Sequence, residues 1–196
     1  TNSSSGNRLA IVGDGSDVNL DALESSDTHG YSVNFHGSFD DVDLTNTVAT
    51  IDSYSIDSLN SFTGSAVDDL VTVADNDFDF SGGNGNDILT IDYEAYTDIN
   101  YMDYYWHTNA GYVSLLELNG TFDGGSGSDY LSFSKTANYL GEYRVVDLTK
   151  ASISNFTGIK GVAPLMVTQA QFDSLSFEAV NSVYIKSDGV VNGNDA

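Results

Sequence analysis

The sequence predicts a single all-β domain built from repeated coils, and two observations lead to this class. Short segments with strand-like composition recur along the 196 residues, separated by Gly, Asn, Asp and Ser. A glycine-rich unit of nine residues also repeats, at spacings that are related to one another. A chain of this length can bury one core, so we expect one domain over residues 1–196.

Strand-like segments alternate apolar and polar residues or are rich in β-branched and aromatic residues. They cover residues 31–35, 70–75, 87–93, 112–118, 130–134, 143–148 and 182–187. Helix signals are few, and we expect one or two short helices. The clearest is "TQAQFDSL", in which Thr168 and Gln171 fit a capping box while Phe172 and Leu175 share one face.

The nine-residue unit occurs twice in full, as "GGNGNDILT" from Gly82 and "GGSGSDYLS" from Gly124. A weaker copy, "GSAVDDLVT", begins at Gly64, and residues 12–20 and 190–196 resemble decayed or truncated copies. The aspartate in the sixth place recurs after 18 residues and then after 42, which is 24 more than 18. The spacing predicts a regular coil that carries an insertion at about residues 94–117.

The charge is strongly one-sided, with 29 acidic residues, 6 basic ones and a net charge of −23. No Lys or Arg occurs between Arg8 and Lys135, although Asp and Glu recur throughout that stretch. Unpaired charges repel one another in a compact body and are costly to bury, so an external cation is the simplest compensation. Ca²⁺ is the expected partner, because it prefers oxygen ligands.

Composition also excludes several classes of protein. The chain has no cysteine, so it forms neither disulfides nor thiolate metal sites. Binding to nucleic acid, or to an anionic membrane surface, needs clustered Lys and Arg, which are absent, and no apolar run is long enough to cross a bilayer. The opening "TNSSSGNRLA" has neither an initiating Met nor a signal pattern, so we expect a fragment processed or excised from a larger protein.

The G-G-x-G-x-D-x-U-x pattern of these units resembles the calcium-binding repeats of the RTX (repeats-in-toxin) family. The segments "VDLTNT" and "VVDLTKASISNFTGIKG" are similar to the linking segments of large RTX adhesins and surface-layer proteins. The resemblance implies a right-handed parallel β-roll or β-helix solenoid. In such a solenoid the first six residues of each unit form a turn and the last three form a short strand.

The resemblance further implies a set of metal ligands in the turns. The sixth-position aspartates would donate carboxylate oxygens, and backbone carbonyls of the glycine-rich turns would complete the shell. The implied Ca²⁺ residues are Asp69, Gly82, Gly83, Asn84, Gly85, Asp87, Gly124, Gly125, Ser126, Gly127 and Asp129. Val71, Leu89 and Leu131, in the eighth place, would point into the core. We expect one to three ions, and metal-free Gly/Asn turns are the alternative.

Other polar and aromatic clusters have two interpretations. Tyr104, Tyr105 and Trp106 in the insertion would form a sugar-binding platform or would simply pack against the solenoid. The acidic runs at 40–43 and 75–79 are solvated faces or additional cation ligands. The three histidines are too scattered to form a transition-metal site.

The expected function is that of a calcium-binding structural or adhesive module in a secreted or cell-surface protein, folding when calcium binds. Two alternatives stay open, namely a module that binds carbohydrate or another surface ligand, copies of a surface protein included, and an accessory module of a polysaccharide-modifying enzyme. We do not expect an enzyme. Carboxylate pairs are too abundant here to indicate catalysis, and "GGSGS" is explained by the repeat better than by a nucleophile elbow.

Overall fold

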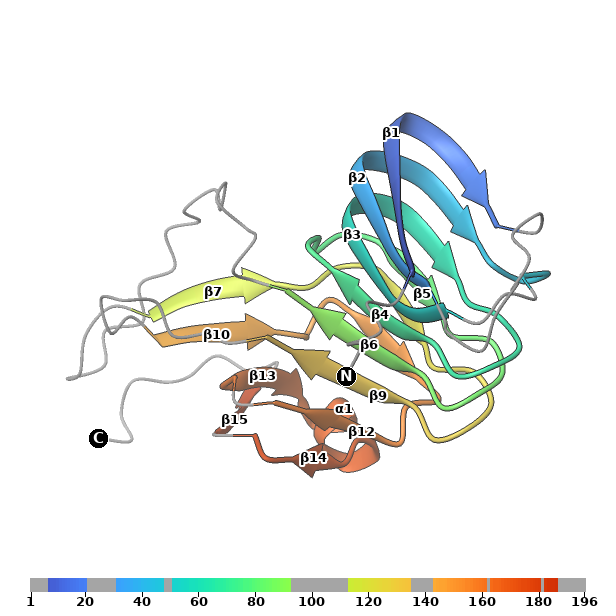
Figure 1. Ribbon diagram of the computed structural model, residues 1–196. Helices are drawn as coiled ribbons and strands as arrows, with labels where there is room; N and C mark the ends of the chain where they lie inside the picture. Colours follow the sequence, from blue (N-terminus) through green and yellow to red (C-terminus); the bar gives the residue numbers. More distant parts are fainter. Residues whose placement is uncertain are drawn as a thin grey trace, which may run out of the picture.

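The computed structural model describes residues 7–20, 31–47, 51–92, 113–134, 143–161, 163–180 and 182–186. Its strands are mostly parallel and wind into a β-solenoid of about 6 coils (Figure 1). This confirms the predicted class, an all-β parallel solenoid. The aromatic residues of the insertion, Tyr104, Tyr105 and Trp106 among them, lie outside the described residues.

The larger sheet contains 11 strands, each pairing in parallel with its counterpart in the neighbouring coil. The first three strands are 13 residues long and curve around the end of the solenoid drawn in blue in Figure 1. In later coils two shorter strands replace each long one. The 11 strands are β1 (Asn7–Asn19), β2 (Tyr31–Asp43), β3 (Ile51–Thr63), β4 (Leu70–Val73), β5 (Asp79–Ser81), β6 (Ile88–Ile91), β8 (Thr121–Asp123), β9 (Tyr130–Phe133), β11 (Ser152–Ser154), β12 (Gly158–Lys160) and β14 (Phe177–Glu178).

A second sheet of 4 strands widens the later coils. Its order is β15-β13-β10-β7, and its strands are β7 (Val113–Glu117), β10 (Tyr143–Asp147), β13 (Leu165–Thr168) and β15 (Val183–Lys186). Strand β7 lies in the predicted insertion. Strands β6 and β9 still pair directly, with Ile88 opposite Tyr130, so the 24 extra residues leave the main stack uninterrupted.

The described residues include one helix, α1 (Gln169–Ser174). The side chain of Thr168 accepts a hydrogen bond from the backbone N–H of Gln171, and the Gln171 side chain accepts one from the backbone of Thr168. This is the predicted capping box. Within the described part of the chain no helix is long and apolar enough to span a membrane.

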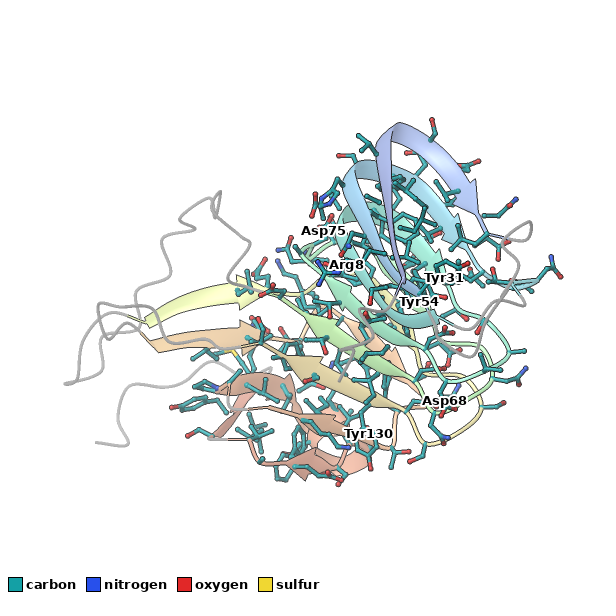
Figure 2. All side chains as sticks on the ribbon, in the orientation of Figure 1. Arg8, Tyr31, Tyr54, Asp68, Asp75 and Tyr130 are labelled. Atoms are coloured by element: carbon teal, nitrogen blue, oxygen red, sulfur yellow. The ribbon has the colours of Figure 1, made fainter. Side chains whose placement is uncertain are left out.

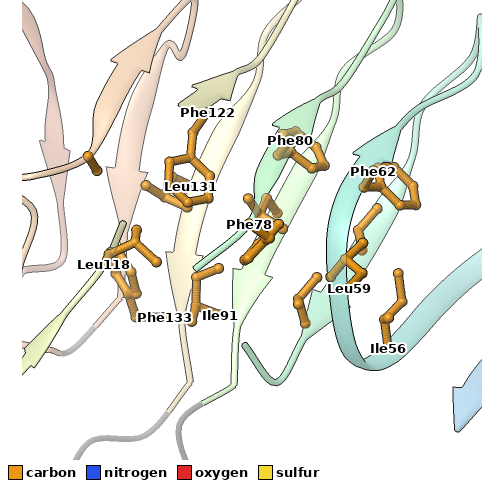
Figure 3. Packing of buried hydrophobic residues seen from close by; sticks show 14 of the residues in the cluster. Ile56, Leu59, Phe62, Phe78, Phe80, Ile91, Leu118, Phe122, Leu131 and Phe133 are labelled. Atoms are coloured by element: carbon orange, nitrogen blue, oxygen red, sulfur yellow. The ribbon is translucent and has the colours of Figure 1, made fainter. Parts of the chain in front are cut away.

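The core consists of rows of apolar side chains, one from each coil. Val71, Leu89 and Leu131 lie opposite one another on β4, β6 and β9 and are fully buried, as predicted. Phe62, Phe80 and Phe122 follow one another along the core in Figure 3. The rings of Phe62 and Phe80 stack with centroids 5.5 Å apart. Strand alternation supplies these rows, because every second residue points inward.

Each of the seven predicted strand segments coincides with all or part of a strand, but the sequence did not indicate β1, β3, β13, β14 or the three-residue strands. Of residues 12–20, predicted as a decayed or truncated copy of the unit, all but Leu20 lie in β1, which pairs with β2. The other predicted fragment, 190–196, lies outside the described residues.

Candidate functional site

The sixth-position aspartates Asp69, Asp87 and Asp129 form a column, with one residue in each of three consecutive coils. Their exposed fractions are 3%, 0% and 0%. The backbone N–H of Asp69 donates to Oδ1 of Asp87 at 2.8 Å, and the N–H of Asp87 donates to Oδ1 of Asp129 at the same distance. We call these three residues the aspartate column. One oxygen of each later carboxylate therefore joins its coil to the preceding one.

Glycine-rich turns bring the column together. The turn at 82–87 stacks on the turn at 124–129, where the N–H of Ser126 donates to the carbonyl of Gly83 and the N–H of Gly85 donates to the carbonyl of Ser126. Gly83 and Gly85 have φ values of 93° and 127°. A residue with a side chain adopts such angles only at a cost, which explains the glycines in the second and fourth places of the unit.

The first glycine of each unit is required for a different reason, since no positive φ occurs there. A Cβ at Gly82 would collide with the carbonyl oxygen of Gly124 and with Oδ2 of Asp87. A Cβ at Gly64 would likewise collide with the carbonyl oxygen of Gly82 and with Oδ2 of Asp69. At both places the aspartate oxygen and the carbonyl oxygen of the next coil converge over the glycine.

Two oxygens of the column have no partner. Oδ2 of Asp87 and Oδ2 of Asp129 are both buried without a hydrogen bond. Burial raises the pKa of Asp87 to about 7; the negative charges of Asp69, Asp129 and Asp68 add to this effect, and the hydrogen bond from the Asp69 N–H opposes it. A buried carboxylate with an unpaired oxygen is destabilising unless a proton or a cation compensates it.

Asp69 differs from the other two members of the column because it has its own donors. The backbone N–H and the hydroxyl of Ser65 donate to its Oδ2 at 2.7 and 3.1 Å, and the Tyr54 hydroxyl also hydrogen-bonds to this carboxylate. Burial still raises the pKa of Asp69. Burial, with the Asp69 charge second, also raises the pKa of Tyr54. In the weaker copy of the unit, hydrogen bonds from Ser65 and Tyr54 thus satisfy the Asp69 carboxylate, whereas Asp87 and Asp129 each have one unpaired oxygen.

The column ends where the sequence leaves the motif. Thr157 takes the place of the aspartate in the next coil, and its N–H donates to the backbone carbonyl of Asp129 at 2.8 Å. A second ladder runs beside the column at the exposed fifth position, on the turn side where Figure 2 labels Asp68. There the N–H of Asn86 donates to Oδ1 of Asp68, and the N–H of Ser128 donates to Oδ1 of Asn86.

The oxygen donors around the aspartate column determine whether Ca²⁺ could bind there. No three Asp, Glu or His side chains converge to hold a metal within the described ranges, because the column supplies one carboxylate per coil. An ion here would rest on one or two carboxylates and on backbone oxygens. The unpaired oxygens of Asp87 and Asp129 are hard anionic ligands, and the Gly124 carbonyl oxygen converges with the first of them over Gly82. These donors fit Ca²⁺ in chemical type.

The eleven residues of the predicted metal set lie in the three stacked turns. The sequence did not indicate Tyr54 or Ser65 as partners of Asp69. Tyr54 lies outside the nine-residue units, and Ser65 stands where the two full copies have their second glycine. The acidic runs mostly accept hydrogen bonds from the neighbouring coil, as in the pairs Asn60 to Asp40 at 3.0 Å and Ser61 to Asp41 at 2.5 Å.

The fold and the column together define a parallel β-solenoid with stacked glycine-aspartate turns. Comparison with protein families, with curated proteins and with solved structures found no match to this chain.

Proposed function

We propose that this chain is a calcium-stabilised structural module of a secreted or cell-surface RTX-like protein, with an adhesive or spacing role. The observation that carries the proposal is the pair of buried, unpartnered oxygens, Oδ2 of Asp87 and Oδ2 of Asp129, in stacked turns. The absence of any Lys or Arg between Arg8 and Lys135 supports it, because no side-chain cation in that stretch compensates these charges.

In this proposal the carboxylates of Asp87 and Asp129 hold the ions, and carbonyl oxygens of the turns at 82–85 and 124–127 contribute. Asp69 contributes less, because Ser65 and Tyr54 already satisfy its carboxylate. Calcium neutralises the repulsion along the column and stabilises the folded state by its binding free energy. The module is then incompletely folded where calcium is scarce, as inside a cell, and compactly folded where calcium is abundant, as outside it.

The test is calcium binding measured together with folding. Isothermal titration should give between one and three Ca²⁺ ions per chain, and Mg²⁺ at the same concentration should bind more weakly because it demands a tighter octahedral shell. Circular dichroism should show a higher melting temperature in calcium than in chelator. Identical melts in the two conditions would contradict the proposal.

A matched pair of variants assigns the effect to the column. Asp87→Ala should remove most of the gain in melting temperature that calcium produces. Asp77→Ala should keep it, because Asp77 is exposed. Equal calcium gains in the two variants would place any bound ion elsewhere.

A further inference from the structure

One face of the solenoid carries no charge over three consecutive strands. The outward-pointing residues of β4, β6 and β9 are Leu70, Thr72, Ile88, Thr90, Tyr130 and Ser132. We call these six residues the neutral face. Leu70 is 42% exposed, and the other five are half-buried by their neighbours on the sheet.

The neutral face has two parallel rows in register. Leu70, Ile88 and Tyr130 lie opposite one another in the first row, and Thr72, Thr90 and Ser132 do so in the second. One row is apolar or aromatic, and the other consists of hydroxyls. Successive members of a row are about 4.8 Å apart, which is the spacing of paired strands.

The same rows continue without charge through the two preceding coils and end at β1, where Arg8 lies opposite Ser32. Ser53 and Ser55 of β3, and Ser32 and Asn34 of β2, occupy the corresponding outward positions. At the other end Lys160 follows Ser132 in the hydroxyl row, and its ammonium lies 3.0 Å from the centroid of the Tyr130 ring. Figure 2 labels Tyr130 at this end of the solenoid, near β12 and β14.

The absence of charge is unexpected in a chain with a net charge of −23. The outward residues of β5 and β8, which lie on another side of the solenoid, include Asp79 and Asp123. Asp68 borders the neutral face on the turn side. The carboxylates are therefore distributed around the face, and at its edge Glu178 of β14 accepts a hydrogen bond of 3.4 Å from the Tyr130 hydroxyl.

This distribution of charge selects the kind of partner. An anionic polymer would be repelled by the surrounding carboxylates, and a cationic one would bind the acidic face instead. A second copy of this chain is disfavoured by the same repulsion. It is also disfavoured by area, because five strands with two outward residues each offer about 300 Å² at ordinary strand spacing. A stable protein interface buries about 800 Å² on each partner.

We propose that the neutral face binds a neutral, unbranched polysaccharide lying across the strands. Sugar rings present apolar faces and hydroxyl edges, and the face offers an apolar row beside a hydroxyl row. Leu70 and Ile88 contact the ring faces, and Tyr130 adds the edge of its ring, because Lys160 lies over its face. Thr72, Thr90 and Ser132 exchange hydrogen bonds with sugar hydroxyls. The site is separate from the aspartate column and does not depend on the calcium proposal.

The test is co-sedimentation of the whole chain with insoluble cellulose, chitin and β-1,3-glucan, with binding to acidic alginate measured separately. Binding to at least one of the neutral polymers, and weaker binding to alginate, is expected. The informative variant is Thr90→Lys, which places an ammonium at the centre of the face. It should weaken binding by about tenfold or more, because an unpaired charge would be desolvated on contact.

The matched control is Thr121→Lys, which makes the same change on an outward position of β8. It should bind like the unchanged chain, and circular dichroism should show both variants folded. Absence of binding to all three neutral polymers overturns the proposal, as does equal binding by the two variants. Dissociation of a dimer by Thr90→Lys, seen by sedimentation velocity, overturns it in favour of self-association.

Discussion

The backbone N–H of Asp87 donates a hydrogen bond of 2.8 Å to Oδ1 of Asp129, which lies 42 residues later in the chain. The two carboxylate oxygens of Asp129 therefore have different roles. Oδ1 holds adjacent coils together, whereas Oδ2 is buried and unpaired. The oxygens of Asp87 differ in the same way, because Oδ1 accepts a hydrogen bond from the Asp69 N–H and Oδ2 is buried without a partner. A substitution that keeps one oxygen acceptor and removes the charge can therefore distinguish the roles of the two oxygens.

Replacing Asp87 by Asn tests this division. Asn keeps an oxygen acceptor for the Asp69 N–H and removes the buried negative charge. In chelator the variant should be at least as stable as the unchanged chain, because the uncompensated charge is gone. In calcium it should be less stable, because a ligand is lost. Thermal melts in both conditions give the comparison.

Asp77→Asn is the control, because Asp77 is exposed. This variant should melt at the same temperature as the unchanged chain in both buffers. A fall in stability of Asp87→Asn in chelator as large as in calcium would show that the charge itself is not unfavourable. Asp87→Ala should cost about 1–3 kcal/mol even without calcium, because the buried N–H of Asp69 loses its acceptor.

The stability of the calcium-free protein should depend on pH in the opposite sense to ordinary acid denaturation. Burial raises the pKa of Asp87 to about 7, and Asp69, Asp129 and Asp68 are the charged groups facing it. The folded state then binds a proton at Asp87 more tightly than the unfolded state does. The resulting gain in folding stability is complete below the ordinary carboxyl pKa and is lost as pH rises through about 7.

Melting temperatures in chelator should accordingly rise as pH falls from about 8 to about 5. Hydrogen bonds from Thr45 lower the pKa of Asp43, so its contribution to stability is lost as pH falls, but only in more acidic solution. Asp87→Asn should flatten the slope. Calcium should flatten it as well, because the ion replaces the proton. A slope that persists unchanged in Asp87→Asn would assign it to other groups.

The spacing of glycine and aspartate predicted a regular coil and the offset of its motifs, and the resemblance to RTX repeats implied the parallel solenoid. The 18- and 42-residue intervals between Asp69, Asp87 and Asp129 correspond to direct stacking. The long strands β1 and β3 escaped prediction, because "GDGSD" in β1 resembles a turn and the outward positions of β3 hold mostly Ser, Asp and Asn, which are typical of loops. The contact between Tyr54 and Asp69 depends on the register between coils, which local composition does not encode.

The first glycine of the unit should be less replaceable than a glycine with a positive φ on the surface. Gly82→Ala places a methyl group against the carbonyl of Gly124 and Oδ2 of Asp87, so either the turns separate or the carboxylate moves. We expect a loss of about 1–3 kcal/mol in the free energy of unfolding, as for other overpacked sites. Urea unfolding measures it.

Gly15→Ala is the comparison, because Gly15 has a φ of 96° and no atom near its added Cβ. Only backbone strain acts there, and the expected loss is about 1 kcal/mol. A larger loss at Gly15 than at Gly82 would contradict the tight stacking of the turns. Gly82→Ala should in addition weaken calcium binding, because the methyl group occupies the space where the two oxygens converge.

The aromatic row should contribute more to stability than any exposed ring. Phe80 is 2% exposed, stacks on Phe62 at 5.5 Å and lies 6.3 Å from Phe156. Truncating Phe80 to Ala leaves a cavity between coils, and the expected loss in the free energy of unfolding is about 3–5 kcal/mol.

Phe172→Ala is the matched control, because Phe172 is 41% exposed and stacks on Phe177 at the surface. Its loss should be about 1 kcal/mol or less. Urea unfolding in calcium separates the two, and equal losses would mean that the row of rings does not form one continuous core.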